Sequence, residues 1–205
     1  MTNYCIVDLE SVADESVIPL LKPPRAAKNL KDPAKIAADV AEKTAAQLEG
    51  LSLDPAGCRI VALGWDGVVH AALNTEQESY DLNHFWSTVA GRTLVGYNCI
   101  AFDLPVLLTR SRILGVSTPH YDVKKWGCQG VIDLMLDLSF NGLVDYKSLG
   151  FWCKRLGLDV PDDESTGADI AGMVARGEWD RVKHHCLADI TKIEALFKRL
   201  YPHAI

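Results

Sequence analysis

The sequence predicts one α/β domain, in which a mixed β-sheet is flanked by α-helices. An apolar run at residues 4–9 indicates a buried strand at the start of the chain. A hairpin pattern follows at 59–73, and later short apolar runs alternate with segments of helical periodicity. A length of 205 residues suits one well-packed domain and is short for two.

The composition is that of an ordinary globular protein. Hydrophobic residues make up 48% of the chain and charged residues 23%, and no apolar run approaches the roughly 18 residues of a membrane-spanning helix. The first residues lack the pattern of a signal peptide, so we expect a cytoplasmic location and reduced thiols. The six cysteines form no C-x-x-C pair and are expected to be core residues.

The first strand ends in two carboxylates, Asp8 and Glu10. Because side chains alternate between the faces of a strand, both point to one side with Cα atoms roughly 7 Å apart, and Leu9 points to the other. Two carboxylates so placed can reach one metal ion. A strand that runs into a polar turn has the same pattern, so this pair alone does not decide between the two readings.

Residues at about 12–57 are expected to form a basic helical insertion. Prolines exclude regular structure from its first part, and Asp32 and Pro33 then supply an N-cap and a first helical residue. Apolar residues recur every four positions from Ile36 to Leu48, which makes a narrow stripe. We therefore expect this helix to lie against the surface near the carboxyl end of the first strand.

The insertion also concentrates positive charge in a chain of net charge −6. Five cations stand against the single acid Asp32: Lys22, Arg25, Lys28, Lys31 and Lys35. A net negative protein can meet a polyanion only through local basic patches or metal ions. We expect this stretch to lie beside Asp8 and Glu10, with Lys28 and Lys31 contacting substrate, although a solvated loop would look the same.

The remaining elements follow in order along the chain. The dipeptide Asp66-Gly67 suits the positive φ angles of a type I′ hairpin turn. We expect strands at 59–65, 68–73 and 93–97, and a short strand at 131–135 that turns into a helix. Helices are expected at about 81–91, from Asp103, after Ser148 and from Trp179 to Leu200. The last helix is the clearest, because its apolar residues recur every three or four positions.

Three motifs occur in order along these elements. They are Asp8-x-Glu10, Asn98-x-x-x-Phe102-Asp103, and a histidine four or five residues before Asp189. Together they resemble the motifs of the DEDD superfamily of 3′-to-5′ exonucleases, which have a ribonuclease H-like fold. The likeness covers nearly the whole chain and is closest to the proofreading exonuclease of family B DNA polymerases and its free-standing phage and bacterial relatives.

The resemblance implies phosphodiester hydrolysis assisted by two Mg²⁺ or Mn²⁺ ions. Asp8 would bridge both ions, Glu10 and Asp189 would complete the site that holds the attacking water, and Asp103 would act on the second ion. Four further residues would contact the terminal nucleotides: Leu9, Ser11, Asn98 and Phe102.

The activity implied is the release of mononucleotides from the 3′ end of single-stranded DNA. A ribonuclease is the alternative within the class, because the same four acids serve both polymers. A catalytically silent module that binds nucleic acid or a partner is the alternative outside it. We expect no polymerase domain in 205 residues, so a DNA polymerase or another replication or repair protein would act with it in trans.

Two adjacent histidines compete for the role of catalytic base. In a continuous helix, at about 100° per residue, His185 lies roughly 40° from Asp189 and His184 roughly 140° away, which favours His185. If the helix began near Cys186 instead, His184 could reach the site from the preceding loop. A zinc site made of these two histidines and Cys186 is disfavoured, because adjacent residues on a helix diverge.

Overall fold

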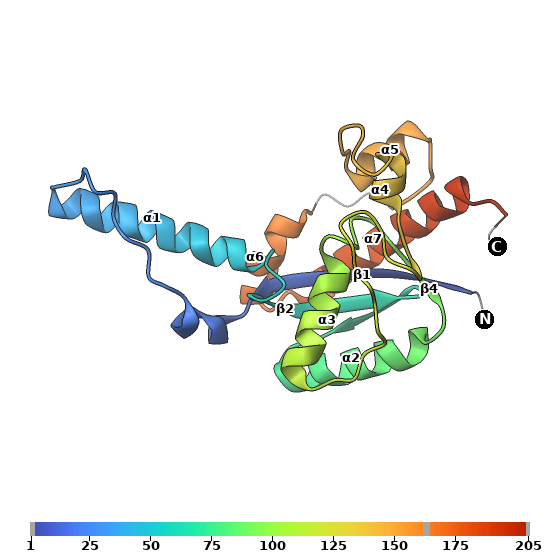
Figure 1. Ribbon diagram of the computed structural model, residues 1–205, viewed down its shortest axis with the longest axis horizontal. Coiled ribbons are helices and arrows are strands. Elements are labelled where there is room, and N and C mark those ends of the chain that lie inside the picture. Colours follow the sequence, from blue (N-terminus) through green and yellow to red (C-terminus); the bar gives the residue numbers. More distant parts are fainter. Residues whose placement is uncertain (1–2, 162–164, 204–205) are drawn as a thin grey trace.

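The computed structural model describes residues 3–161 and 165–203. The elements, in chain order, are β1 (Tyr4–Ala13), η1 (Glu15–Leu20), α1 (Pro33–Leu51), β2 (Cys58–Trp65), β3 (Val68–Ala71), α2 (Thr75–Val89), β4 (Thr93–Gly96), α3 (Asp103–Leu114), β5 (Val131–Asp133), α4 (Leu134–Leu138), α5 (Leu149–Arg155), η2 (Gly167–Asp169), α6 (Ile170–Ala175) and α7 (Trp179–Leu200). The strands form one sheet in the order β3-β2-β1-β4-β5. Helices flank it (Figure 1), so the predicted α/β class with a mixed sheet is confirmed.

Strand β1 is central and is paired differently on its two edges. It runs antiparallel to β2 from Val7 to Ala13, with an irregularity in register after Glu10. It runs parallel to β4 only from Tyr4 to Ile6. The second half of β1 therefore extends past the end of β4, and its edge there is open to side chains from other elements.

Each face of the sheet carries its own core. Val7 and Leu9 lie in one apolar cluster with residues of α2 and α3, such as Phe85 and Leu107. The opposite face packs against helices α6 and α7. The alternation of β1 between two buried faces explains why its sequence is apolar at nearly every position before Asp8.

The hairpin after the insertion forms at the predicted turn. Asp66 and Gly67 have φ angles of 51° and 80° between β2 and β3. Helix α2, predicted from about residue 81, begins earlier, at Thr75, where the side chain of Asn74 accepts a hydrogen bond from the Gln77 amide. The first turns of α2 are polar, so the apolar periodicity did not reveal where the helix begins. Glu78 in these turns is nevertheless buried.

Two expectations from composition can be compared with the structure. All six cysteines are buried and have free thiols, which confirms them as core residues. None of the helices in the described part of the chain is both long and apolar enough to cross a membrane.

The insertion after β1 is an arm, residues 15–57, that projects from the body at the carboxyl end of β1 (Figure 1). Its helix α1 begins at Pro33, with the Asp32 side chain accepting from the Ala34 amide, as predicted. The 19 residues of α1 span about 28 Å at 1.5 Å per residue, and the buried residue among them is Leu51 at the last position.

A strap, residues 21–30, runs antiparallel along α1. The carbonyls of Lys22 and Arg25 accept hydrogen bonds from the side chains of Gln47 and Lys43, at 3.4 and 3.2 Å. The residues of the narrow apolar stripe of α1 are half-buried, and Leu48, near its C-terminal end, lines a cavity together with Val12 and Val174 of the body.

The expected placement near the carboxyl end of β1 holds for the C-terminal end of α1 and is wrong for the rest of the helix, which projects away from the body (Figure 1). Helix α1 is attached by its C-terminal end, where the Ser11 hydroxyl donates to the Ser52 carbonyl at 2.7 Å. Lys28 and Lys31 precede the N-terminal end of α1, so they lie at the far end of the arm and not beside Asp8 and Glu10. The spacing of the apolar residues from Ile36 to Leu48 predicted the helix, but it could not show which segment of the chain would pack against those residues.

Candidate active site

Strand β1 presents Asp8 and Glu10 to the face covered by α7. Ile6 and Val12, which have the same parity, lie in the core cluster that includes α7. Leu9 lies in the opposite cluster and is 5% exposed. The predicted alternation thus holds, and the two carboxylates share one face.

A glycine lets α7 approach this face closely. Gly64 of β2 pairs with Asp8, and a Cβ atom on it would lie 2.3 Å from Cδ1 of Ile190 and 3.1 Å from Sγ of Cys186. With that space free, the Cys186 thiol reaches the backbone carbonyl of Asp8 at 3.7 Å. Helix α7 therefore contacts the sheet beside the first carboxylate.

Asp103, at the start of α3, lies at the edge of β1 that β4 leaves unpaired. Its carboxyl group accepts hydrogen bonds from its own backbone N–H and from that of Leu9. Burial, with a further contribution from the nearby charge of Asp133, raises the pKa of Asp103 to about 7. The end of β4 at Gly96 leaves the Leu9 amide available to this carboxyl.

Asp133, at the end of β5, shapes the loop that carries the second motif. Its carboxylate accepts hydrogen bonds from the backbone N–H groups of Asn98 and Ile100, at 2.9 and 3.0 Å, and from those of Met135 and Leu136. Asn98 adopts a φ of 62°, which asparagine tolerates better than most residues. Asp133 therefore has a structural role, since it fixes the backbone of this loop and caps α4.

Asp189 enters from α7 and already has a cationic neighbour. Lys192, one turn further along, places Nζ 2.8 Å from the Asp189 carboxylate, with 14% of the lysine side chain exposed. Sequence reasoning did not single out Lys192. The available signal was its position three residues after an acid on a helix, where side chains are neighbours.

Three of the predicted carboxylates lie near enough to the fourth, Asp8, for their charges to act on it. The pKa of Asp8 is raised well above its usual value, first by burial and then by the negative charges of Glu10, Asp103 and Asp189. Such mutual repulsion is relieved when a cation binds. The pattern of charge is therefore that of a site able to hold a metal.

The donor set favours hard cations over soft ones. Ligand atoms of Asp8, Glu10 and Cys186 lie within 4.8 Å of one another. Burial and the negative charge of Asp8 raise the pKa of the Cys186 thiol well above its usual value, so the sulfur stays protonated and is a poor ligand. The remaining donors are carboxylate oxygens, which suit Mg²⁺ and Mn²⁺.

The two histidines have different surroundings. Helix α7 is continuous from Trp179, which is the condition under which geometry favours His185. His185 is 6% exposed, and its Nε2 lies 3.6 Å from Oε1 of Glu10. His184 is exposed. Among the described residues, the ligand atoms close enough together to share one metal ion belong to Asp8, Glu10 and Cys186, and this group includes neither histidine and neither Asp103 nor Asp189.

The predicted substrate contacts stay predictions, and the structure places their residues in several environments. The side chain of Leu9 lies in the core, and the hydroxyl of Ser11 is bonded to Ser52 at the base of the arm. Asn98 and Phe102 are half-buried in the loop that leads into α3. The exposed Lys28 and Lys31 lie on the arm, away from the carboxylates.

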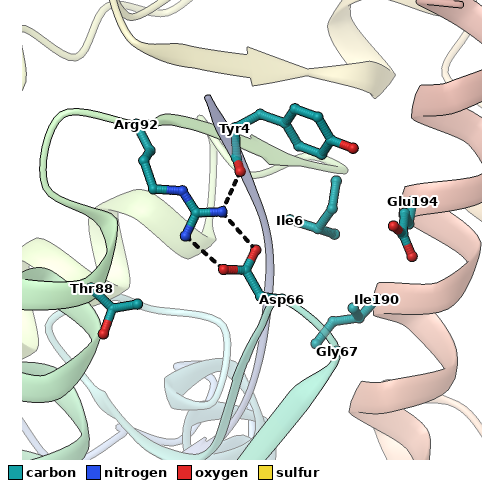
Figure 2. A pocket seen from close by; sticks show the side chains of 8 residues that line it. All are labelled: Tyr4, Ile6, Asp66, Gly67, Thr88, Arg92, Ile190 and Glu194. Atoms are coloured by element: carbon teal, nitrogen blue, oxygen red, sulfur yellow. Dashed lines mark hydrogen bonds and ion pairs between the residues drawn. The ribbon is translucent and has the colours of Figure 1, made fainter. Parts of the chain in front are cut away.

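A separate recess lies toward the amino end of β1. Its cavity of about 510 Å³ is bordered by Tyr4, Ile6 and the second half of α7, including Glu194. Figure 2 shows that the Arg92 guanidinium within it is bonded to both oxygens of Asp66 and to the Tyr4 carbonyl. Because that charge is matched internally, and none of the four carboxylates lines the cavity, we do not assign the chemistry to it.

One relative in sequence and one solved structure are similar to this chain. The chain is 30% identical over 177 residues to an uncharacterized protein of Methanocaldococcus jannaschii, which covers 77% of this chain and 94% of that protein. The family B DNA polymerase of Pyrobaculum calidifontis superposes with a TM-score of 0.59 at 16% identity. The superposition covers 97% of this chain but 24% of the polymerase, and it shows a sheet like that of the polymerase exonuclease domain, of ribonuclease H-like fold.

A family model identifies the group of proteins. The model described as "Predicted 3'-5' exonuclease related to the exonuclease domain of PolB" matches residues 66–202, a segment that contains Asp103 and Asp189. The strand with Asp8 and Glu10 precedes the matched segment. The chain belongs to this family of predicted 3′-5′ exonucleases related to the exonuclease domain of PolB.

Proposed function

We propose that this protein is a metal-dependent 3′-to-5′ exonuclease of the DEDD type that removes nucleoside monophosphates from single-stranded DNA. The observation that carries the proposal is the convergence of four carboxylates from β1, α3 and α7, with the charges of Glu10, Asp103 and Asp189 all raising the pKa of Asp8. A surface cluster of acids would be solvated, whereas Asp103 and Glu10 are buried.

The four carboxylates would hold two divalent cations, Mg²⁺ or Mn²⁺. When bound, a pair of such ions neutralises the charge that develops on the attacking and leaving oxygens of a phosphodiester. In the chain itself, Asp8 presents its carboxylate between α7 and the open edge of β1, and Asp103 is fixed there by the Leu9 amide. Lys192, one turn further along α7, balances the negative charge of Asp189.

His185 would accept the proton of the attacking water. Its Nε2 faces Glu10 at 3.6 Å, so the imidazole and this carboxylate can orient one water molecule between α7 and β1. Its Nδ1 lies 3.5 Å from the Ser165 hydroxyl, a contact that can fix the ring.

Single-stranded substrate is favoured because a site built around one terminal phosphodiester cannot grip an intact duplex. Phe102, half-buried next to Asp103, could stack on a terminal base without regard to its identity. The same four acids serve DNA and RNA, so polymer type is an outcome of the experiment.

The proposal is tested by digesting 5′-labelled and 3′-labelled single strands of DNA and RNA of equal sequence with Mg²⁺, Mn²⁺ or EDTA. We expect the 5′-labelled DNA to shorten in single-nucleotide steps with either metal, the 3′ label to be released as a mononucleotide at once, and EDTA to stop both. An Asp8→Asn variant, purified in the same way, controls for contaminating nuclease. Preferential digestion of RNA would change the substrate, and binding without cleavage would support a silent module.

A further inference from the structure

The arm carries charge that the protein does not use internally. Its five cations between residues 22 and 35 are all exposed, and four of them recur at every third residue: Lys22, Arg25, Lys28 and Lys31. Within the described residues, the ion pair of the arm is between Lys43 and Asp39, and it includes none of these five cations. The basic residues are therefore available to an outside anion in a protein of net charge −6.

These cations follow the length of the arm. The carbonyl of Lys22 contacts Gln47 and that of Arg25 contacts Lys43, and these two partners are four residues apart on α1, or about 6 Å. Lys35 lies in the first turn of α1, at the far end. Phosphates of a stacked strand are spaced by about 3.4 Å, so a track of charges several ångströms apart matches a polynucleotide backbone.

The arm is also joined to the strand that carries the carboxylates. At its base the Ser11 hydroxyl bonds to Ser52, and the Asp14 amide bonds to the Gly57 carbonyl at 2.8 Å. The Asp14 carboxylate receives Arg110 of α3 at 2.8 Å. Since Asp8 lies only five residues before Ala13, roughly 16 Å along β1, the arm begins next to the site and leads away from it.

We propose that the arm binds phosphates of the substrate strand that lie several nucleotides away from the 3′ end held at the carboxylates. This inference rests on the proposed function. The roughly 16 Å from Asp8 to the end of β1 and the roughly 28 Å length of α1 together correspond to about thirteen nucleotides of a stacked strand, or about six if the strand is stretched to twice that spacing. The tip of the arm thus meets long substrates and cannot meet a tetranucleotide whose 3′ end is in the site.

The test compares two substrate lengths and two charge-reversed variants. Lys28→Glu/Lys31→Glu alters the tip, and Lys198→Glu/Arg199→Glu makes the same change of charge at the exposed C-terminal end of α7, on the other side of the molecule (Figure 1). Fluorescence anisotropy measures binding of a single strand of about 30 nucleotides over a range of salt, and single-turnover digestion measures cleavage of that strand and of a tetranucleotide.

We expect the tip variant to bind the long strand about tenfold more weakly at low salt. The slope of the logarithm of its binding constant against the logarithm of salt concentration should become shallower by roughly 1.4. Each lost contact with a single-stranded phosphate removes about 0.7 from that slope. Cleavage of the tetranucleotide should stay within about twofold of the unaltered protein, and the α7 variant should resemble the unaltered protein on both lengths.

Three results would overturn the inference: unchanged binding of the long strand by the tip variant, an equal loss in the α7 variant, or an equal loss on the tetranucleotide. A partner protein as the true occupant of the arm would give the first of these. If the unaltered protein cleaves neither substrate, the proposed function fails, while the anisotropy comparison still decides whether the arm binds nucleic acid. A Lys28→Gln/Lys31→Gln variant, with half the change of charge, replaces the reversed one if circular dichroism shows lost helix.

Discussion

Nε2 of His185 lies 3.6 Å from Oε1 of Glu10, so a histidine of α7 and a carboxylate of β1 face each other across the candidate site. Both residues are buried, with exposed fractions of 6% and 8%. The neighbouring His184 is exposed on the same helix. The two histidines are therefore chemically inequivalent although they are adjacent in sequence.

The first prediction concerns these histidines. His185→Ala should lower single-turnover cleavage at about pH 8 by a hundredfold or more, because a positioned general base contributes about that much. The measurement is single-turnover digestion by each variant, with His184→Ala as the matched control that keeps a near-normal rate. Loss of activity through His184→Ala alone would reverse the assignment.

The second prediction concerns Asp8. Asp8→Ala should abolish cleavage, because it removes the carboxylate that lies among the other three. Stability without metal should hold or rise, since the replaced group is a desolvated charge beside like charges. Digestion and thermal unfolding in EDTA test both effects, with Asp122→Ala on an exposed loop as control. A variant of normal circular dichroism that kept more than about a hundredth of the rate would contradict the role.

Much of the site could be predicted because its geometry is local to single elements. The period of two along β1 places Asp8 and Glu10 on one face wherever that strand lies. The apolar period of α7 fixes the angle between His185 and Asp189 once the helix is known to be continuous. The turn at Asp66-Gly67 follows from backbone conformations that few residue pairs adopt.

The parts that could not be predicted depend on contacts between distant segments. The narrow stripe of α1 is compatible with packing on the body or on the strap, and only the fold distinguishes the two. The first turns of α2 include Glu78, which looks like a surface residue until Arg110, 32 positions later, binds it. Polar residues buried by a remote partner have no signature in a local pattern.

The third prediction concerns stability and pH in the absence of metal. Because the pKa of Asp103 is about 7 in the folded protein against 3.8 ordinarily, the folded state binds a proton that the unfolded state has released between those values. The free energy of unfolding should therefore fall as the pH rises from about 4 to 7 and change little through this group above that.

Thermal unfolding in EDTA at about pH 5 and pH 8 measures the effect. Asp103→Asn keeps an acceptor for the Leu9 amide but removes the titration, so the difference between the two pH values should shrink relative to the unaltered protein. Mg²⁺ should raise the melting temperature at pH 8 more than at pH 5, because protons compete with the metal for these carboxylates. An unchanged pH difference in the variant would show that Asp103 is not the group responsible.

The last prediction concerns the ion cluster between the base of the arm and the body. Arg110 of α3 is 2% exposed and binds both oxygens of Glu78 at 2.7 Å, while its third contact is Asp14 at the start of the arm. Arg110→Met fills similar space but leaves Glu78, 1% exposed, as a buried charge without its cation. We expect a loss of about 3–5 kcal/mol in the free energy of unfolding. Arg112→Met, on the exposed side of the same helix, should change it by no more than about 0.5 kcal/mol.

The double variant separates the burial of a charge from the loss of packing around Arg110. In the unaltered protein the Ile60 amide donates a hydrogen bond to Oε1 of Glu78 at 3.0 Å. In Glu78→Gln/Arg110→Met the glutamine can still accept this bond, and it carries no charge. The double variant should therefore be more stable than Arg110→Met alone, since removing both ions costs less than stranding one. Urea denaturation of the two single variants and the double variant completes the cycle. If the losses of the single variants simply add, Arg110 and Glu78 are not coupled, and the loss in Arg110→Met comes from packing rather than from an unpaired carboxylate.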